Sequence, residues 1–250
     1  MLVILSPTKT QNFSPISGSE FSQPSQLKKA NYLMTLLKGF SKSQLKKFMV
    51  LSEKLTDETY NHIQAFELNN PTKKIKQALF AYTGAVFSQI KPETFSKKAL
   101  VFSQSNIRIL SGLYGVLKPL DLIQPYRLEM AKKLKTNRGV QLVDFWKTTI
   151  TNSLNEDEKE IIINLASKEY LKAIQAKALK AQMIHIHFKE KKGDNYKVVG
   201  FFAKQARGKM VNFIVNNKIT TPALLKSYHE DDYAFNPSLS SKFDWVFTRG

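Results

Sequence analysis

The clearest strand signal in the chain is Ile161-Ile162-Ile163-Asn164-Leu165, four aliphatic residues around one amide. Continuous apolar runs of this length are typical of strands buried on both faces of a parallel sheet. Leu2–Leu5 and Ile107–Leu110 are two further strand candidates, and each is followed by a polar loop. The sequence therefore predicts a sheet whose central strands are buried.

Helical spacing of apolar residues fills much of the chain between these strands. Ser41 followed by Gln44 has the pattern of a capping box, which starts a helix. Met183–Phe188 and Tyr196–Phe202 are predicted to pair as a hairpin, and Phe243–Phe247 to form a last strand. Helices are predicted over residues 26–37, from Ser41 onward, and over 51–66, 75–82, 144–154 and 205–215.

The order of these elements indicates the fold class. Strands alternate irregularly with helices and include an antiparallel pair, which favours an α+β or mixed α/β fold over a repeating βαβ array. No change in composition marks a linker, and we find no internal repeat. We therefore expect residues 1–250 to form one domain, with a mixed central sheet flanked by helices and a mainly helical first third.

The net charge of +18 comes from 38 lysines and arginines against 20 acidic residues. Each half of the chain carries half of this excess, so no basic tail accounts for it. A surplus of this size indicates a polyanionic partner, although a lysine-rich surface that is merely solvated would have the same composition. The guanidinium of arginine can donate two parallel hydrogen bonds to one phosphate, which lysine cannot do. The positions of the five arginines are therefore more informative than the lysine excess.

Composition also limits the compartment and the chemistry. The chain has no apolar run of the roughly 18 residues that a bilayer span needs, and Met1–Leu5 lacks a basic leader. We therefore expect a cytoplasmic protein with no membrane partner and no obligatory protein partner. The absence of cysteine removes thiolate catalysis and cysteine-based metal sites. No cofactor or metal is predicted; His185 and His187, two apart, are expected to cover one face of the hairpin.

Three polar loops follow the three predicted buried strands. Ligands in open α/β sheets gather beyond the carboxyl ends of the strands. If these strands are parallel neighbours, the loops would bring five polar side chains to one pocket; each could instead make only a cap or turn hydrogen bond. These side chains are Lys9, Tyr114, Asn164, Ser167 and Glu169.

Two further segments have the residue types of a phosphate or base contact. Lys204-Gln205-Ala206-Arg207-Gly208-Lys209 places three cations at the predicted start of a helix, where amide groups favour an anion. Tyr126-Arg127 adds an aromatic ring and a guanidinium, which together suit stacking on an unpaired base. Without a ligand role, Lys204–Lys209 would be an exposed first turn of a helix whose side chains are solvated, and the tyrosines would be buried aromatic residues.

At these residues the sequence resembles the YaaA family of bacterial peroxide-stress proteins, and the resemblance spans nearly the whole chain. The segments that carry it are Ser6–Thr10, Leu110–Asp121, Gln124–Met130, Asn164–Ser167 with Glu169-Tyr170, and Ala203-Lys204 with Ala206–Gly208. The resemblance implies a DNA-binding protein that limits free intracellular iron under peroxide stress, with an unusual α/β fold, a basic cleft and a helix-hairpin-helix-like element. The expected place of that element is Gly112-Leu113-Tyr114-Gly115, one residue longer than the usual turn.

Our first hypothesis is a cytoplasmic DNA-binding protein of the peroxide stress response that holds duplex or bubbled DNA in a basic cleft with little sequence specificity. Tyr114 or Tyr126 would stack on exposed bases. The predicted DNA or phosphate contacts are Lys9, Arg108, Gly112, Tyr114, Gly115, Lys118, Tyr126, Arg127, Asn164, Ser167, Tyr170, Lys204, Arg207 and Lys209.

The alternative is an enzyme that acts on a nucleotide or on a flipped DNA base in a metal-free pocket formed by the loops after the strands. Glu169 or Asp121 would be its general acid or base, and Lys9 would help to hold phosphate. Direct iron storage is a weaker third hypothesis, because the histidines and carboxylates show no ligand spacing.

Overall fold

The computed structural model describes residues 1–16, 20–69, 71–158 and 160–250. Its main sheet has eight strands in the order β4-β3-β1-β6-β7-β10-β9, and β8 pairs with β7. The strands of this sheet are β1 (Leu2–Leu5), β3 (Ile107–Ser111), β4 (Gly115–Leu117), β6 (Ile161–Asn164), β7 (Gln182–Lys192), β8 (Asn195–Lys197), β9 (Ala234–Phe235) and β10 (Asp244–Arg249). The predicted mixed α/β class is therefore confirmed.

The three buried strands predicted from apolar runs lie side by side at the centre of the sheet. β1 pairs in parallel with β3 on one side and with β6 on the other. β7 and β10 extend the parallel part, and β4, β8 and β9 pair antiparallel at the edges. All four residues of β1 are buried, which explains why its sequence is apolar throughout. The carboxyl ends of β1, β3 and β6 therefore meet at one edge of the sheet.

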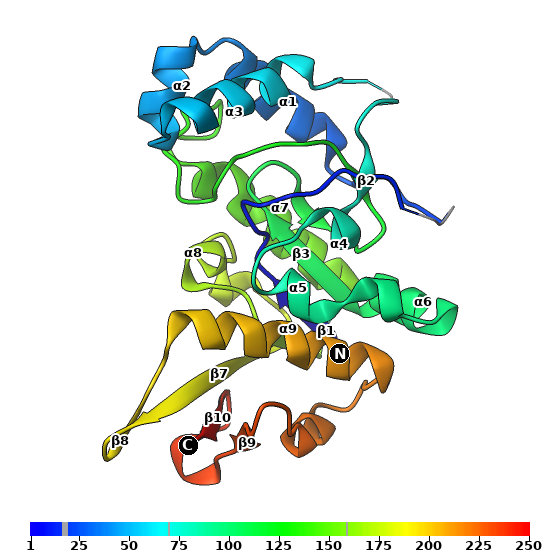
Figure 1. The fold of residues 1–250 in the computed structure, drawn as a ribbon, viewed down its shortest axis with the longest axis vertical. Helices are drawn as coiled ribbons and strands as arrows, with labels where there is room; N and C mark the ends of the chain where they lie inside the picture. The colour runs from blue at the N-terminus through cyan, green and yellow to red at the C-terminus, as the bar shows by residue number, and fades with distance from the viewer. Residues whose placement is uncertain (17–19, 70, 159) are drawn as a thin grey trace.

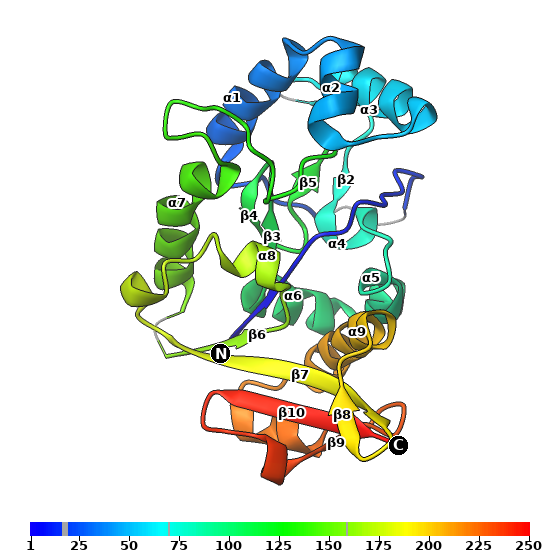
Figure 2. The ribbon, with the colours of Figure 1, turned by 90° about the vertical axis from the view of Figure 1, so that its left-hand side faces the viewer.

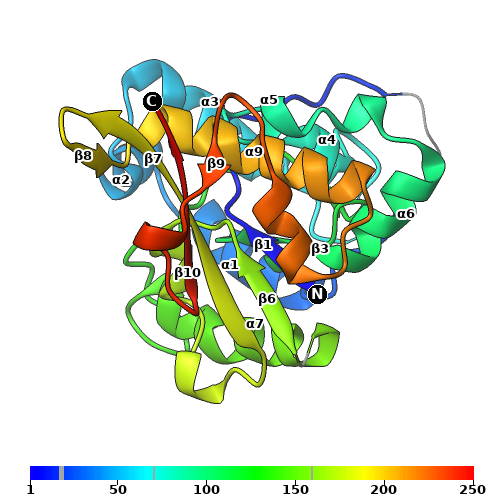
Figure 3. The ribbon, with the colours of Figure 1, turned by 90° about the horizontal axis from the view of Figure 1, so that it is seen from below.

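Three helices form one end of the molecule, and others cover the sheet. In Figures 1 and 2, α1, α2 and α3 lie together at one end of the molecule, and β9 and β10 lie at the other. In Figures 2 and 3 the central strands lie between α7 and α9. The α-helices are α1 (Leu27–Lys38), α2 (Lys42–Met49), α3 (Glu53–Ala65), α4 (Ala78–Ala81), α5 (Phe87–Ile90), α6 (Lys97–Asn106), α7 (Leu142–Asp157), α8 (Lys168–Leu171) and α9 (Gly200–Asn216).

Most predicted helices are confirmed, and local sequence explains where they begin. Ser41 accepts from the backbone N–H of Gln44, whose side chain accepts from the backbone N–H of Ser41 at 2.8 Å, so the predicted capping box starts α2. The prediction over 75–82 is wrong in part, because Lys76–Gln77 is the strand β2, which pairs with β5 (Leu122–Ile123). The chain becomes helical there only over the four residues of α4.

The predicted hairpin is confirmed as β7 and β8, but its second strand ends at Lys197 rather than at Phe202. Residues 200–202 form the first turn of α9 instead. Two adjacent aromatic residues favour a strand by propensity, and tertiary packing overrides that preference here. Within the described parts of the chain, no helix is both long enough and apolar enough to cross a bilayer.

The segment Gly112–Gly115 is a tight turn between β3 and β4, so it joins two strands rather than two helices. Its glycines have packing roles. A Cβ on Gly112 would lie 2.2 Å from the carbonyl oxygen of Leu128, and Gly115 has φ +72° with the ring of Trp146 directly beside it. The indole N–H of Trp146 donates to the carbonyl of Gly112 at 2.8 Å, so α7 holds this turn in place.

Candidate functional site

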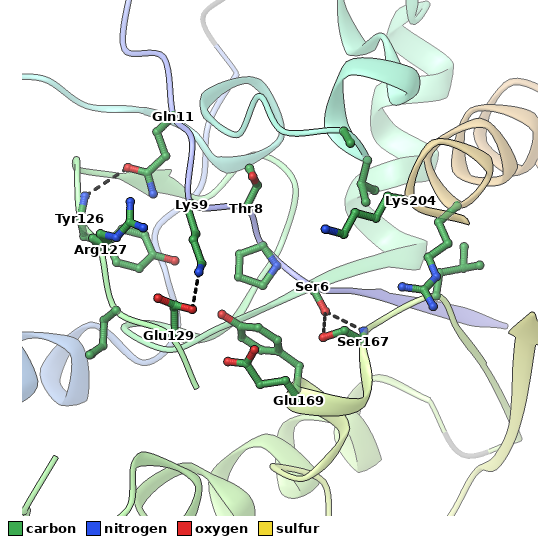
Figure 4. A pocket seen from close by; sticks show the side chains of 17 residues that line it. Ser6, Thr8, Lys9, Gln11, Tyr126, Arg127, Glu129, Ser167, Glu169 and Lys204 are labelled. Carbon is green, nitrogen blue, oxygen red and sulfur yellow. Dashed lines mark hydrogen bonds and ion pairs between the residues drawn. The ribbon is translucent and has the colours of Figure 1, made fainter. Parts of the chain in front are cut away.

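A pocket of about 500 Å³ opens at the carboxyl ends of the central strands. The segment after β1, the segment after β6, residues 126–129 and α9 all contribute to its wall, as Figure 4 shows. Among the predicted site residues, the pocket is lined by Lys9, Tyr126, Arg127, Ser167, Glu169, Tyr170, Lys204 and Arg207. Residues from four distant parts of the sequence therefore share one cavity.

Two serines connect the segments that follow β1 and β6. The Ser6 hydroxyl donates to the Ser167 hydroxyl at 3.2 Å and accepts from the backbone N–H of Ser167 at 2.8 Å (Figure 4). Ser167 occupies the cap position of α8 as predicted, yet its hydroxyl bonds Ser6 and makes no capping bond. This contact sets the position of Glu169, which lies in the first turn of α8 and accepts from the backbone N–H of Ala131 at 3.1 Å.

The segment 126–129 forms the opposite wall and is held by hydrogen bonds at both ends. The backbone N–H of Tyr126 donates to Gln11 at 3.1 Å, and Lys9 pairs with Glu129 at 2.7 Å (Figure 4). Leu128 lies against Gly112, where the missing Cβ lets the two backbones approach closely. The turn between β3 and β4 therefore supports the pocket wall from behind.

The Tyr126 hydroxyl lies between two other buried hydroxyls. Its phenol oxygen lies 2.7 Å from the Ser111 hydroxyl and 2.6 Å from that of Tyr82. Burial raises the pKa of Tyr126 to about 12, and burial also raises the pKa of Tyr170. Both phenols are therefore neutral at physiological pH, and the Tyr126 hydroxyl is engaged by Ser111 and Tyr82.

Helix α9 supplies two of the four cations of the pocket. Gly208 packs directly on residue 86, because a Cβ there would lie only 2.0 Å from the carbonyl oxygen of Val86. This close approach brings Lys204 and Arg207 to the pocket beside the short helix α5. Figure 4 shows Lys204 reaching from the α9 side towards the segment of Thr8 and Lys9.

Two arginines of the pocket have unused donors. Within the described residues, the Nε atoms of Arg127 and Arg207 are buried and have no hydrogen-bond partner. Burial also lowers the pKa of Arg207, although a guanidinium stays charged in any protein environment. Buried polar groups are usually paired, and a buried charge without a partner is costly. The site is therefore arranged to receive acceptor atoms that carry negative charge.

Several predicted site residues lie outside the pocket lining. Asn164 accepts from the backbone N–H of Ala166 and contacts His185 at 2.9 Å, and Tyr114 is 1% exposed and accepts from the backbone N–H of Gln124. Lys209 pairs with Asp231. The other predicted residues outside it are Arg108, Gly112, Gly115, Lys118 and Asp121.

Asp121 is buried away from the pocket, and its carboxylate has local partners. It accepts from the Ser22 hydroxyl at 2.6 Å and from the backbone N–H of Lys118 at 2.8 Å. Burial raises the pKa of Asp121, against the effect of these bonds. These contacts give the carboxylate a role in closing the turn 118–121.

The pocket also contains residues that the sequence patterns did not single out as site residues. Gln11 and Glu129 lie within or beside segments that were singled out, but neither has a spacing signal of its own. Ala85 and Val86 come from the connection between α4 and α5. The unusual signal there is Gly84, where a Cβ would overlap the Thr8 side chain.

Comparison of the sequence with known proteins identifies its family. Residues 1–239 match the family model described as peroxide stress protein YaaA. A UPF0246 protein of Acaryochloris marina is 46% identical, with both chains covered completely. UPF0246 proteins of Hahella chejuensis and Colwellia psychrerythraea are 41% and 40% identical over the whole of this chain and 99% of their own. The chain belongs to the YaaA family of peroxide stress proteins.

Proposed function

We propose that this chain is a DNA-binding protein of the peroxide stress response and that its pocket receives a phosphate-bearing unit of the DNA backbone. The observation that carries the proposal is the pair of arginines, Arg127 and Arg207, whose buried Nε donors have no partner among the described residues. Lys9 and Lys204 add two more cations to the same cavity. Arginine and lysine are the residues that neutralise phosphates in protein–DNA contacts.

The composition of the pocket favours backbone recognition over base recognition. Four cations and two carboxylates line it, and Lys9 is already paired with Glu129. Contacts to phosphate position a protein on DNA but carry no sequence information. We therefore expect binding with little sequence specificity, and the chain's net charge of +18 to add a non-specific attraction to any DNA.

Salt dependence provides the first test of this function. If about six phosphates are neutralised, log affinity falls with log salt with a slope of about −5 on duplex DNA and about −4 on single strands. The measurement is fluorescence anisotropy of labelled DNA over a salt series. A flat response would exclude binding through the phosphate backbone.

Substitution of the two arginines tests whether the pocket is the site. Arg127→Gln and Arg207→Gln should each weaken DNA binding about tenfold or more, because each removes a charge-assisted hydrogen bond that is shielded from water. Arg138→Gln is the matched control, since Arg138 is exposed and lies outside the pocket. Equal losses in all three variants would mean that the charge acts through the general surface field and not through the pocket.

The proposed consequence in the cell is a lower level of free iron and less oxidative DNA damage during peroxide stress. It is supported by the assignment of the chain to a family of peroxide stress proteins. In a strain that lacks the chain, complementation with wild type should lower the level of free iron under peroxide, and complementation with Arg207→Gln should not. If wild type and Arg207→Gln lower free iron equally, the pocket does not take part in the stress response.

The second candidate function is an enzyme that acts on a nucleotide or on a flipped base. The observation that favours it is the enclosure of Glu169 and Glu129 with neutral tyrosines in a cavity of nucleotide-sized volume. Glu169 would be the acid or base, since Asp121 lies outside the pocket. Mass analysis of DNA and nucleotides incubated with wild type and Glu169→Gln tests it, and no product with wild type would exclude it.

A further inference from the structure

An exposed aromatic side chain lies at the start of α9, three residues before the pocket-lining Lys204. Phe201 is 60% exposed, although a phenylalanine is usually buried in a folded protein. Its ring contacts Phe202 edge-on, with 5.7 Å between the centroids. Phe202 is in turn covered by the Arg249 guanidinium, whose carbon lies 4.6 Å from the ring centroid. Phe202 is therefore anchored to the body of the protein, whereas Phe201 presents its ring to solvent.

The helical repeat places Phe201 three residues before Lys204, the first of the two cations that α9 contributes to the pocket. Residues three apart are neighbours on a helix surface, so Phe201, Lys204 and Arg207 form one continuous row. Lys204 and Arg207 both line the pocket. The helical rise separates Phe201 from Arg207 by about 9 Å along the axis, a span of about three nucleotides in a stacked strand.

The hairpin that precedes α9 is rich in positive charge. Residues 189–209 contain seven lysines and arginines against two acidic residues. Lys191, Lys192 and Lys197 are exposed, and within the described parts of the chain none of the three is in an ion pair. Figures 1 and 3 show the β7–β8 hairpin projecting from the body next to the start of α9. In the sequence, Phe201 therefore lies between the lysines of the hairpin and the cations of α9.

Single-stranded nucleic acid is bound by this combination of features. Aromatic rings stack on unpaired bases while a row of cations follows the backbone. Tyr114 and Tyr126, the two tyrosines predicted to stack, are 1% and 6% exposed, so Phe201 is much more accessible to a base than either. An anionic membrane would also attract exposed aromatics and lysines. The row of Phe201, Lys204 and Arg207 leads into the pocket that contains both arginines. A strand of nucleotides could follow this row into the pocket, whereas a lipid surface could not, so we favour the nucleic acid.

We propose that Phe201 is a base-stacking residue and that the proposed DNA ligand is a strand with unpaired bases, lying from the β7–β8 hairpin along α9 into the pocket. This inference rests on the proposed function, because Arg207 would hold the phosphate of the same strand. It identifies the preferred substrate class as single-stranded or locally unpaired DNA. Phe201 would recognise the face of a base, so the preference would not depend on sequence.

The test compares the affinity of four variants for labelled oligothymidylate and for a fully paired duplex. Phe201→Ala should weaken binding of the single strand about fivefold or more and affect the duplex less. Phe201→Trp should retain the affinity, and its added indole fluorescence should be quenched when the strand binds. Phe21→Ala is the matched control, because Phe21 is also 60% exposed and does not line the pocket. Arg207→Gln is measured on the same two DNAs and tests whether the pocket itself contributes to binding.

Each outcome of this comparison is decisive. If Arg207→Gln weakens binding but Phe201→Ala binds the single strand as Phe21→Ala does, the stacking inference falls and the proposed pocket function stands. If wild type binds neither DNA, both fall. If Phe201→Ala loses binding to phosphatidylserine vesicles and keeps its binding to DNA, the surface is a membrane contact and the inference is overturned.

Discussion

Two arginines of this protein, Arg108 on β3 and Arg207 on α9, are both at least partly buried, but their surroundings differ. Arg108 is 3% exposed and makes a two-pronged pair with Asp157, with donor–acceptor distances of 2.6 and 2.7 Å. It also donates to the carbonyls of Gln104 and Ile107. The Nε of Arg207 is buried and has no partner among the described residues, and the Arg207 side chain contributes to the pocket wall.

The difference separates a buried charge that serves the fold from one that the proposed ligand would pair. Arg108 is satisfied within the protein, so its charge ties the end of α7 to the central sheet. Among the described residues no partner offsets the desolvation cost of the Arg207 Nε, and the proposed phosphate ligand would offset it. Both residues were predicted as DNA contacts, and the structure distinguishes them by their partners.

The largest expected effect in this comparison is on stability at Arg108. Arg108→Met removes a buried guanidinium that pairs with Asp157 and donates to two backbone carbonyls, so the free energy of unfolding should fall by about 3 kcal/mol. For a chain of this length, that loss lowers the melting temperature by roughly 6–12 °C. Calorimetry measures it. The double variant Arg108→Met/Asp157→Leu should recover much of the loss, and no recovery would contradict the pairing argument.

The second effect concerns the contact that gives Arg207 its position. In Gly208→Ala the new Cβ meets the backbone of Val86, so we expect the free energy of unfolding to fall by about 1–3 kcal/mol. DNA affinity should fall as well, because α9 is pushed away from the pocket wall. Gly200→Ala is the control, since nothing lies within 4 Å of its added Cβ. Equal stability of the two variants would show that α9 can shift at no cost.

A third buried charge, Asp121, has neutral partners and should produce a smaller, pH-dependent effect. Burial raises the pKa of Asp121 in the folded state above its unfolded value of about 3.9, so the folded protein takes up the proton more readily. Its contribution to stability is then present at low pH and lost as pH rises through the folded pKa. Urea unfolding of wild type and Asp121→Asn from acid to neutral pH should show wild type losing stability relative to the variant; a relative gain would contradict this sign.

The smallest expected effect is at Arg207 itself. Arg207→Met should leave the free energy of unfolding within about 0.5 kcal/mol of wild type, or raise it, because no partner in the protein loses its bond. Urea unfolding in parallel with Arg108→Met measures the contrast. A loss as large as that of Arg108→Met would mean that Arg207 is also structural, and the distinction between the two arginines would fail.

Local sequence patterns predicted those parts of the fold whose signal lies within a few residues. The strands β1, β3 and β6 are apolar because they are buried, and the capping box of α2 is complete within four residues. The start of α9 was missed because Phe201 and Phe202 have strand propensity, and the packing partner of Phe202, Arg249, lies far along the chain. Residues 76–77 became a strand for the same reason, since their partner is β5.

For the candidate site, the order of the three strands was the decisive unknown. The polar residues after each strand were visible in sequence, but their meeting depends on β1 lying between β3 and β6. Asn164 and Ser167 show the limit of residue-type reasoning. They are three positions apart in one polar segment, yet Ser167 lines the pocket and Asn164 turns to His185.

The amino-acid sequence alone determined the family, the buried strands, the excess of positive charge and the absence of thiol chemistry, because each of these is a property of composition or of short-range order. Only the tertiary structure decided which cations are free. Arg108, Lys209 and Arg207 have the same charge, and an ion pair with Asp157 or Asp231 occupies the first two. Electrostatic partners are set by distances in space between residues remote in sequence, so no local pattern can reveal them.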